Sequence, residues 1–282
     1  MKLIQDIIQK EFDSLLDEIK PLSGGSINDV CLIEFSGLSF VIKTNDSNAY
    51  PNMFEKEVLG LSLLNKSNFK IPKVIKCGQH HKKAYLILEY IESSGTLDWH
   101  QFGANLANLH LISNENFGLS YDNYIGSLVQ LNQNKKQWSD FYSEMRIYPL
   151  LKKAFEMSLI CKKDLDIGVH FCMQLSSFLP NEPPSLLHGD LWSGNLINDQ
   201  QGTPVLIDPA VYFGFREMDL AMLQLFGSIP TSAMDAYQDV YPLQKDWQNR
   251  VEINQLYPLL VHLVLFGSSY YNSVMNILRK YS

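Results

Sequence analysis

Asp190, Asn195 and Asp208 are the residues whose types and spacing most clearly allow chemistry. Asp190 and Asn195 lie in the segment HGDLWSGN (188–195), which separates two short apolar runs and is therefore predicted to be a loop between strands. The apolar run at 203–207 leads into Asp208, which places a carboxylate at the end of a predicted strand. Because Mg²⁺ in proteins is typically bound by one or two carboxylates together with substrate phosphates, these residues predict a site for Mg²⁺ and a phosphorylated ligand.

The spacing H-x-D-x-x-x-x-N resembles that of the protein-kinase catalytic loop. On this resemblance Asp190 receives or orients the proton of a substrate hydroxyl, and Asn195 holds a second Mg²⁺. Asp208 matches the aspartate of the kinase D-F-G motif, with Pro-Ala in place of Phe-Gly. A single Asp at a strand end more often forms a turn or caps a helix, so the interpretation depends on the combination.

A longer string, HGDLWSGN followed by DPAVYFGFREMDLAMLQLFG, resembles the fructosamine-3-kinase (ketosamine-3-kinase) family. That family is similar to the aminoglycoside and choline kinases within the protein-kinase-like superfamily. The resemblance covers nearly the whole chain and is sharpest from about residue 186 to residue 227. It implies an α+β, bilobal protein-kinase-like fold. Residues 1–92 would form an ATP-binding lobe with a small antiparallel sheet and one key helix, and residues 93–282 a mostly helical catalytic and substrate lobe.

The resemblance also implies an activity. The chain would be an ATP- and Mg²⁺-dependent kinase that phosphorylates a sugar hydroxyl of ketosamines, either small molecules or glycated protein lysines. Because phosphorylation makes the adduct unstable, the expected biological role is deglycation.

Composition agrees with an enzyme of this kind and excludes other classes. The chain has 282 residues, of which 46% are hydrophobic and 19% charged, as in ordinary globular proteins. A net charge of −7 without a basic stripe argues against a nucleic-acid partner. Four separated cysteines without a C-x-x-C motif predict reduced thiols. No signal peptide or membrane-spanning run is visible, and the apolar run 259–266 is too short, so a cytoplasmic location without a membrane partner is expected.

The N-terminal part predicts a nucleotide-binding sheet. A helical rhythm over residues 1–19 precedes two strand-like runs, 31–35 and 39–43, which predict a hairpin. Before this hairpin stands a glycine pair with a serine, and backbone amides there could approach ATP phosphates. The residues of this predicted ATP loop are Gly24, Gly25 and Ser26. A plain turn fits the local sequence equally well. Many relatives carry Cys where Ser26 stands, so the thiol that redox control would need is absent at this position.

Lys43 and Glu57 are predicted to form an ion pair that directs the lysine at the α- and β-phosphates of ATP. Lys43 closes the strand Phe-Val-Ile-Lys, although a surface lysine would also fit there. Glu57 lies on the apolar face of the predicted helix 52–64, where an unpaired carboxylate is costly. Glu55 and Lys56 fall off that face and are expected to be solvent-exposed.

Two further strands are predicted at 71–75 and 84–91, with a turn at 80–83. The crossing between the lobes follows them, and its backbone is expected to bind adenine through Glu89, Tyr90 and Ile91. His80 and His81 are adjacent but lack a third ligand nearby, which argues against a metal site.

The C-terminal part is predicted to be helical from Trp99 onward, including 138–151, 165–178 and 250–281. His110 is interpreted as a core or capping histidine, and the loop 117–126 is expected near the mouth of the substrate site. Trp192 is either a platform for the sugar or amine, or a wedge that packs the loop. Supporting roles are assigned to residues around the catalytic segment, with Asp219 anchoring the loop backbone: His188, Glu217 and Asp219.

Two alternatives remain open. An aminoglycoside- or choline-type phosphotransferase is the first, but polycationic acceptors need an acidic pocket and no carboxylate follows Glu252. A nucleotide-binding pseudokinase is the second. Pseudokinases usually lack one of four catalytic residues, all of which are present here: Lys43, Asp190, Asn195 and Asp208.

Overall fold

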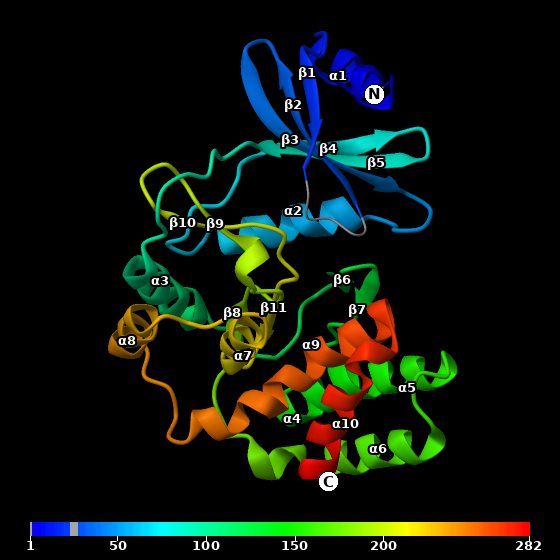
Figure 1. Cartoon of the computed structure of the whole chain (residues 1–282), viewed down its shortest axis with the longest axis vertical. Helices are drawn as coiled ribbons and strands as arrows, with labels where there is room; N and C mark the ends of the chain where they lie inside the picture. The colour runs from blue at the N-terminus through cyan, green and yellow to red at the C-terminus, as the bar shows by residue number, and fades with distance from the viewer. Residues whose placement is uncertain (1, 23–27) are drawn as a thin grey trace.

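The computed structural model describes residues 2–22 and 28–282 (Figure 1). Gly24, Gly25 and Ser26 of the predicted ATP loop lie outside these residues. The N-terminal part is an antiparallel sheet in the order β1-β2-β3-β5-β4. Its elements are α1 (Lys2–Phe12), β1 (Glu18–Pro21), β2 (Asp29–Phe35), β3 (Leu38–Asp46), α2 (Met53–Leu64), β4 (Val74–His80) and β5 (Lys83–Glu89).

Helices α1 and α2 cover opposite faces of this sheet (Figure 1). The alternation of β5 shows why: Tyr85 and Ile87 pack with α1, whereas Leu86 and Leu88 belong to the cluster that contains α2. Successive strand residues point to opposite faces, so a strand that is apolar throughout must be covered on both sides. Helix α2 therefore packs on the face of the sheet that carries Leu86 and Leu88.

In the N-terminal part, two elements differ most from the sequence-based predictions. The first helix ends at Phe12 instead of continuing to residue 19, because Asp13 takes a positive φ of 50° and the chain returns as the edge strand β1. The strand predicted at 71–75 is instead β4, Val74–His80. It is a half-exposed edge strand with an irregular register near Val74, so its sequence lacks the apolar alternation that would mark it.

The C-terminal part is mostly helical with three two-stranded sheets, and the structure confirms the predicted α+β class. Its α-helices are α3 (Trp99–Leu111), α4 (Trp138–Phe141), α5 (Tyr148–Glu156), α6 (Lys162–Phe178), α7 (Glu217–Leu225), α8 (Thr231–Val240), α9 (Val251–Phe266) and α10 (Tyr271–Lys280). Its strands are β6 (Asn123–Ile125), β7 (Leu128–Gln130), β8 (Ser185–Leu187), β9 (Leu196–Asn198), β10 (Pro204–Leu206) and β11 (Tyr212–Gly214). The predicted lobe boundary at residue 92 falls between β5 and α3 and stays a prediction.

Two of these two-stranded sheets bring the candidate catalytic residues together. β8 pairs with β11, and β9 pairs with β10. The HGDLWSGN loop connects β8 to β9, while the segment around Asp208 connects β10 to β11. Each connection begins and ends at strands that are paired with those of the other connection. The two connections therefore lie side by side. Among the described residues, no helix has the length and apolar character needed to cross a membrane.

Candidate active site

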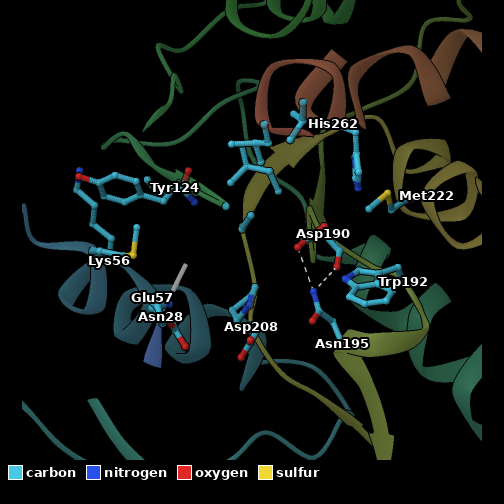
Figure 2. Close-up of a pocket in the computed structure, with 18 of the residues that line it drawn as sticks. Asn28, Lys56, Glu57, Tyr124, Asp190, Trp192, Asn195, Asp208, Met222 and His262 are labelled. Carbon is cyan, nitrogen blue, oxygen red and sulfur yellow. Dashed lines mark hydrogen bonds between the residues drawn. The ribbon is translucent and has the colours of Figure 1, made fainter. Parts of the chain in front are cut away.

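A cavity of about 380 Å³ lies between α2 and the large lobe, and the catalytic candidates line it (Figure 2). This volume is in the range of small-molecule sites. Five of the predicted site residues face it, and a sixth, Trp192, lies at its aromatic side: Lys43, Glu57, Asp190, Asn195, Asp208 and Trp192.

Asp190 and Asn195 are joined directly. The Asn195 Nδ2 donates hydrogen bonds to the Asp190 main-chain oxygen at 2.9 Å and to its Oδ2 at 3.1 Å (Figure 2). Burial raises the pKa of Asp190 to about 7, and the negative charges of Asp208 and Asp219 add to the effect. A carboxyl with a pKa near neutrality is well matched to accept a proton from a substrate hydroxyl.

Asp219 holds the backbone of this loop. Its two carboxylate oxygens accept hydrogen bonds from the main-chain N–H groups of His188 at 2.8 Å and Gly189 at 3.0 Å. Gly189 has a φ of +82°, and a Cβ there would meet the Ala210 oxygen at 2.1 Å. The contacts therefore agree with the anchoring role predicted for Asp219, and they explain the glycine of the HGD motif.

His188 connects the catalytic loop to the segment that carries Asp208. Its ring Nε2 lies 2.9 Å from the Ile207 oxygen, which can only accept, so this nitrogen carries the proton. The main-chain oxygen of His188 accepts from the Ala210 N–H at 2.9 Å. Burial lowers the pKa of His188, so the ring stays neutral. His188 thus binds the backbone on both sides of Asp208 to the catalytic loop.

Lys43 forms ion pairs with both Glu57 and Asp208. The Lys43 Nζ lies 2.6 Å from the Glu57 Oε1 and also contacts the Asp208 Oδ1. The side chains of Lys43 and Glu57 are 5% and 11% exposed, whereas that of Asp208 is 46% exposed and faces the cavity. Burial alone would lower the pKa of Lys43, but the carboxylates of Asp208 and Glu57 raise it above its usual value and keep the lysine charged.

The backbone at Asp208 is unusual, with a φ of +55°. Non-glycine residues rarely adopt this conformation, and such positions concentrate at functional sites. Here it directs the carboxylate toward Lys43 and the cavity.

The oxygen donors at this end of the cavity fit Mg²⁺. Asp208 offers an accessible carboxylate, and Asn195 uses its Nδ2 toward Asp190, which leaves its amide oxygen for a cation. The described residues contain no group of three or more His, Cys, Asp or Glu side chains that could enclose a metal. Two oxygen ligands completed by substrate phosphates are what Mg²⁺ commonly takes.

The opposite side of the cavity is aromatic and apolar. The Phe226 ring lies edge-on to the Trp192 ring, with 6.5 Å between the ring centroids. The His262 ring is tilted against both Phe226 and Phe266, with centroid distances of 4.8 Å and 5.3 Å. Met222 completes this surface (Figure 2). We refer to Trp192, Met222, Phe226, His262 and Phe266 as the aromatic wall.

Apart from Trp192, no residue of the aromatic wall was predicted from the sequence. Residues 250–281 gave only an apolar helical pattern, and α9 turns one side of that pattern toward the cavity. The available signal was His262, a polar residue within the run 259–266. Its Nδ1 lies 2.7 Å from the Pro258 oxygen, which fixes the ring orientation.

Lys56 was expected to be solvent-exposed, and this prediction is wrong. Lys56 is half-buried and lines the cavity, with its Nζ 5.0 Å from the ring centre of Tyr124. The Tyr124 hydroxyl donates to the Pro51 oxygen at 3.0 Å, so strand β6 closes over the start of α2. Helical periodicity cannot reveal a cover that comes from a distant strand. Glu55 is exposed, as expected.

Other predicted residues lie away from the cavity. Among the described residues that line it, Glu89, Tyr90 and Ile91 are not included, and their adenine role stays a prediction. Glu89 instead accepts a hydrogen bond from the Lys73 N–H at 3.1 Å. Glu217 is buried and pairs with Arg250 at 2.6 Å, which joins α7 to α9.

His110 is a core histidine, which agrees with the sequence interpretation. It is buried and lies 2.8 Å from the Tyr237 hydroxyl.

The comparisons with known proteins agree with this arrangement. The fructosamine kinase family model matches residues 1–282. The chain is 39% identical over 266 residues to a "probable ketoamine kinase" of Enterococcus faecium, covering 94% of this chain and 95% of that one. A "probable ketoamine kinase" of Escherichia coli K12 is 36% identical over 254 residues, covering 88% and 87%.

Solved structures support the same grouping. The crystal structure of a candidate fructosamine-3-kinase from Thermobifida fusca superposes with a TM-score of 0.88 at 31% identity and covers 99% of this chain and 98% of that one. Aminoglycoside phosphotransferase APH(4)-Ia, at 16% identity and a TM-score of 0.66 over 100% and 99% of the chains, shares the fold alone. This chain belongs to the fructosamine kinase family, a family of phosphotransferases.

Proposed function

We propose that this protein is an ATP- and Mg²⁺-dependent kinase that phosphorylates a sugar hydroxyl of ketosamines. The observation that carries the proposal is the convergence on one cavity of the Lys43–Glu57 ion pair, Asp208 and the bonded pair Asp190–Asn195. Membership of the fructosamine kinase family supports the acceptor class. The glycine pair at Gly24 and Gly25 and the residues 89–91 remain the proposed contacts for the rest of ATP.

The reaction needs one proton acceptor and charge compensation. The substrate hydroxyl oxygen forms a bond to the γ-phosphorus, the bond from that phosphorus to the ADP oxygen breaks, and the hydroxyl proton passes to the Asp190 carboxylate. Lys43, oriented by Glu57, contacts the α- and β-phosphates. Asp208 and Asn195 would hold Mg²⁺, which when bound neutralises phosphate charge.

The charges in the cavity favour a ketosamine over an aminoglycoside. Three carboxylates of the described chain line it, and each has a role at the phosphate end: Glu57 and Asp208 bond Lys43, and Asp190 bonds Asn195. None remains for a polycationic acceptor. The aromatic wall instead offers flat surfaces, and Trp192 is the proposed platform for a sugar carrying one amine. The amine can belong to a small molecule or a glycated protein lysine.

A coupled assay of ATP consumption tests this function. Ribulose- and fructose-lysine adducts are the proposed acceptors, with kanamycin and choline as rivals. We expect turnover with at least one ketosamine and little with kanamycin or choline. Turnover of a rival alone would overturn the acceptor assignment. Stabilisation by ATP and Mg²⁺ without turnover of any acceptor would instead favour the pseudokinase alternative.

A further inference from the structure

The β6–β7 hairpin carries two buried side-chain amides whose position the proposed reaction does not explain. Asn123 and Gln130 are direct cross-strand partners, and both are buried. The Asn123 Nδ2 donates to the Val211 oxygen at 2.9 Å, and the Gln130 Nε2 donates to the Ala210 oxygen at 3.0 Å. Two neighbouring amides therefore hold two successive carbonyls, which come two and three residues after Asp208.

These carbonyls need partners. Ala210 and Val211 are buried and precede β11, and a buried main-chain oxygen without a hydrogen bond is costly. Carbonyls only accept, so the NH₂ groups of both amides must face the Asp208 segment. The orientation of Asn123 and Gln130 is thus determined by the backbone that they support.

The amides are themselves held from behind. The Asn123 Oδ1 accepts from Gln130 and from Asn132, each at 2.8 Å. The Gln130 Oε1 accepts from the Tyr257 hydroxyl of α9 at 2.7 Å. Arg146, fully buried, donates to the Asn132 Oδ1 at 2.8 Å. The network therefore continues from the hairpin into the core of the large lobe.

We infer that Asn123 and Gln130 are positioning residues for the metal-binding carboxylate of Asp208. The catalytic loop holds one side of this segment, through His188 and through the main-chain oxygen of Asn195, which accepts from the Ile207 N–H at 3.1 Å. The hairpin amides hold the other side. A left-handed φ at Asp208 is costly, and contacts on both sides keep the backbone in it. This inference rests on the proposed role of Asp208.

Asn123→Ala tests the inference, with Asn105→Ala as the matched control. Asn105 is also buried, and its Nδ2 donates to the Asn68 oxygen at 3.1 Å, away from the Asp208 segment. Each variant removes one amide-to-carbonyl hydrogen bond. Asn123→Ala also removes the Oδ1 that accepts from Gln130 and Asn132, so it should lower the Tm more than Asn105→Ala does. The decisive measurement is Mn²⁺ affinity in the presence of a non-hydrolysable ATP analogue, followed by the electron paramagnetic resonance of free Mn²⁺.

We expect Asn123→Ala to weaken Mn²⁺ binding by about 10- to 100-fold, the range for residues that orient metal ligands, and Asn105→Ala to change it by less than about twofold. The KM for the ketosamine should stay unchanged in both variants. Wild-type Mn²⁺ affinity in Asn123→Ala, or equal weakening in both variants, would overturn the inference.

Gln130→Met keeps the length of the side chain and gives the same test if Asn123→Ala fails to fold. Failure of the proposed acceptor looks different from failure of this inference. In that case the wild type would bind Mn²⁺ and nucleotide but turn over no ketosamine, while the difference between Asn123→Ala and Asn105→Ala would persist.

Discussion

The two sides of the cavity are built on opposite physical principles. At the proposed phosphate end, Lys43 forms ion pairs with the carboxylates of both Glu57 and Asp208. At the proposed acceptor end, the aromatic wall offers rings and a thioether, and the imidazole of His262 has a pKa lowered by burial. The difference indicates where free energy is used: preorganised charges stabilise a transition state, whereas an apolar surface mainly contributes binding.

Asp208→Asn should produce the largest effect. A neutral amide cannot balance the charges of metal and triphosphate, and it leaves Lys43 with only one carboxylate partner. We expect kcat to fall by about 10³-fold or more, beyond the usual loss of a single electrostatic group. Thermal melts should show stabilisation by Mg²⁺ and ATP in the wild type and much less in the variant. Equal stabilisation of the two proteins would exclude Asp208 as the metal ligand.

Asp190→Asn removes the proposed proton acceptor and should lower kcat by about 10²–10⁴-fold. ATP affinity should be nearly unchanged, because the groups proposed to contact ATP and its metal are Lys43, Asn195 and Asp208, not Asp190. Steady-state kinetics with calorimetry of nucleotide binding separate the two effects. A variant that retains wild-type kcat would show that the hydroxyl loses its proton without this carboxylate.

Lys43→Met and Glu57→Gln test whether the charged end acts as one unit. The 2.6 Å pair is nearly buried, so losing either partner disorganises the other. We expect each variant to lower kcat/KM by roughly 10²-fold, and the double variant to do little further harm. Losses that add in log(kcat/KM) would instead indicate independent roles.

The pH dependence should report Asp190. Its carboxyl must be ionised to accept a proton, and burial raises its pKa to about 7. At low concentrations of both substrates, activity should therefore fall as pH drops below about 7, approaching tenfold per pH unit. Metal bound beside Asp208 should move this midpoint downward, because it offsets the negative charge that raises the Asp190 pKa. A rate that stays constant down to pH about 4.5 would contradict the raised pKa.

The raised pKa of Asp190 also makes the stability of the folded chain depend on pH. The folded chain binds this proton more tightly than the unfolded chain, so the contribution of Asp190 to stability falls as pH rises from about 4 to about 7.

Trp192→Ala should have the smallest effect. It tests whether the aromatic wall binds the ketosamine independently of the charged end. Contacts with an aromatic ring contribute about 0.5–1.5 kcal/mol beyond burial, so the KM for the ketosamine should rise by about 3- to 10-fold. The KM for ATP should stay close to that of the wild type. If the ring is only a wedge over Gly194, which it contacts closely, kcat should fall and both KM values should hold.

The charged end was predictable from the sequence to a large extent. The pairing of Lys43 with Glu57 followed from one strand end and one inward position on a helix, and the structure contains that ion pair. The anchoring by Asp219 agrees with its hydrogen bonds to His188 and Gly189. Spacing along the chain carries this information for Asp190 and Asn195, which bond to each other within one loop, whereas Asp219 reaches the same loop from a distant helix.

The sequence by itself predicted the α+β class through the family resemblance and the HGDLWSGN loop through its motif. It also predicted the pairing of Lys43 with Glu57, because a buried carboxylate requires a partner of opposite charge. Only the tertiary structure decided the aromatic wall, the half-buried position of Lys56 and the support of Asp208 by Asn123 and Gln130. These depend on which face of α9 and which strand of a distant hairpin reach the cavity. Apolar periodicity predicts that a face is covered, but only packing decides what covers it.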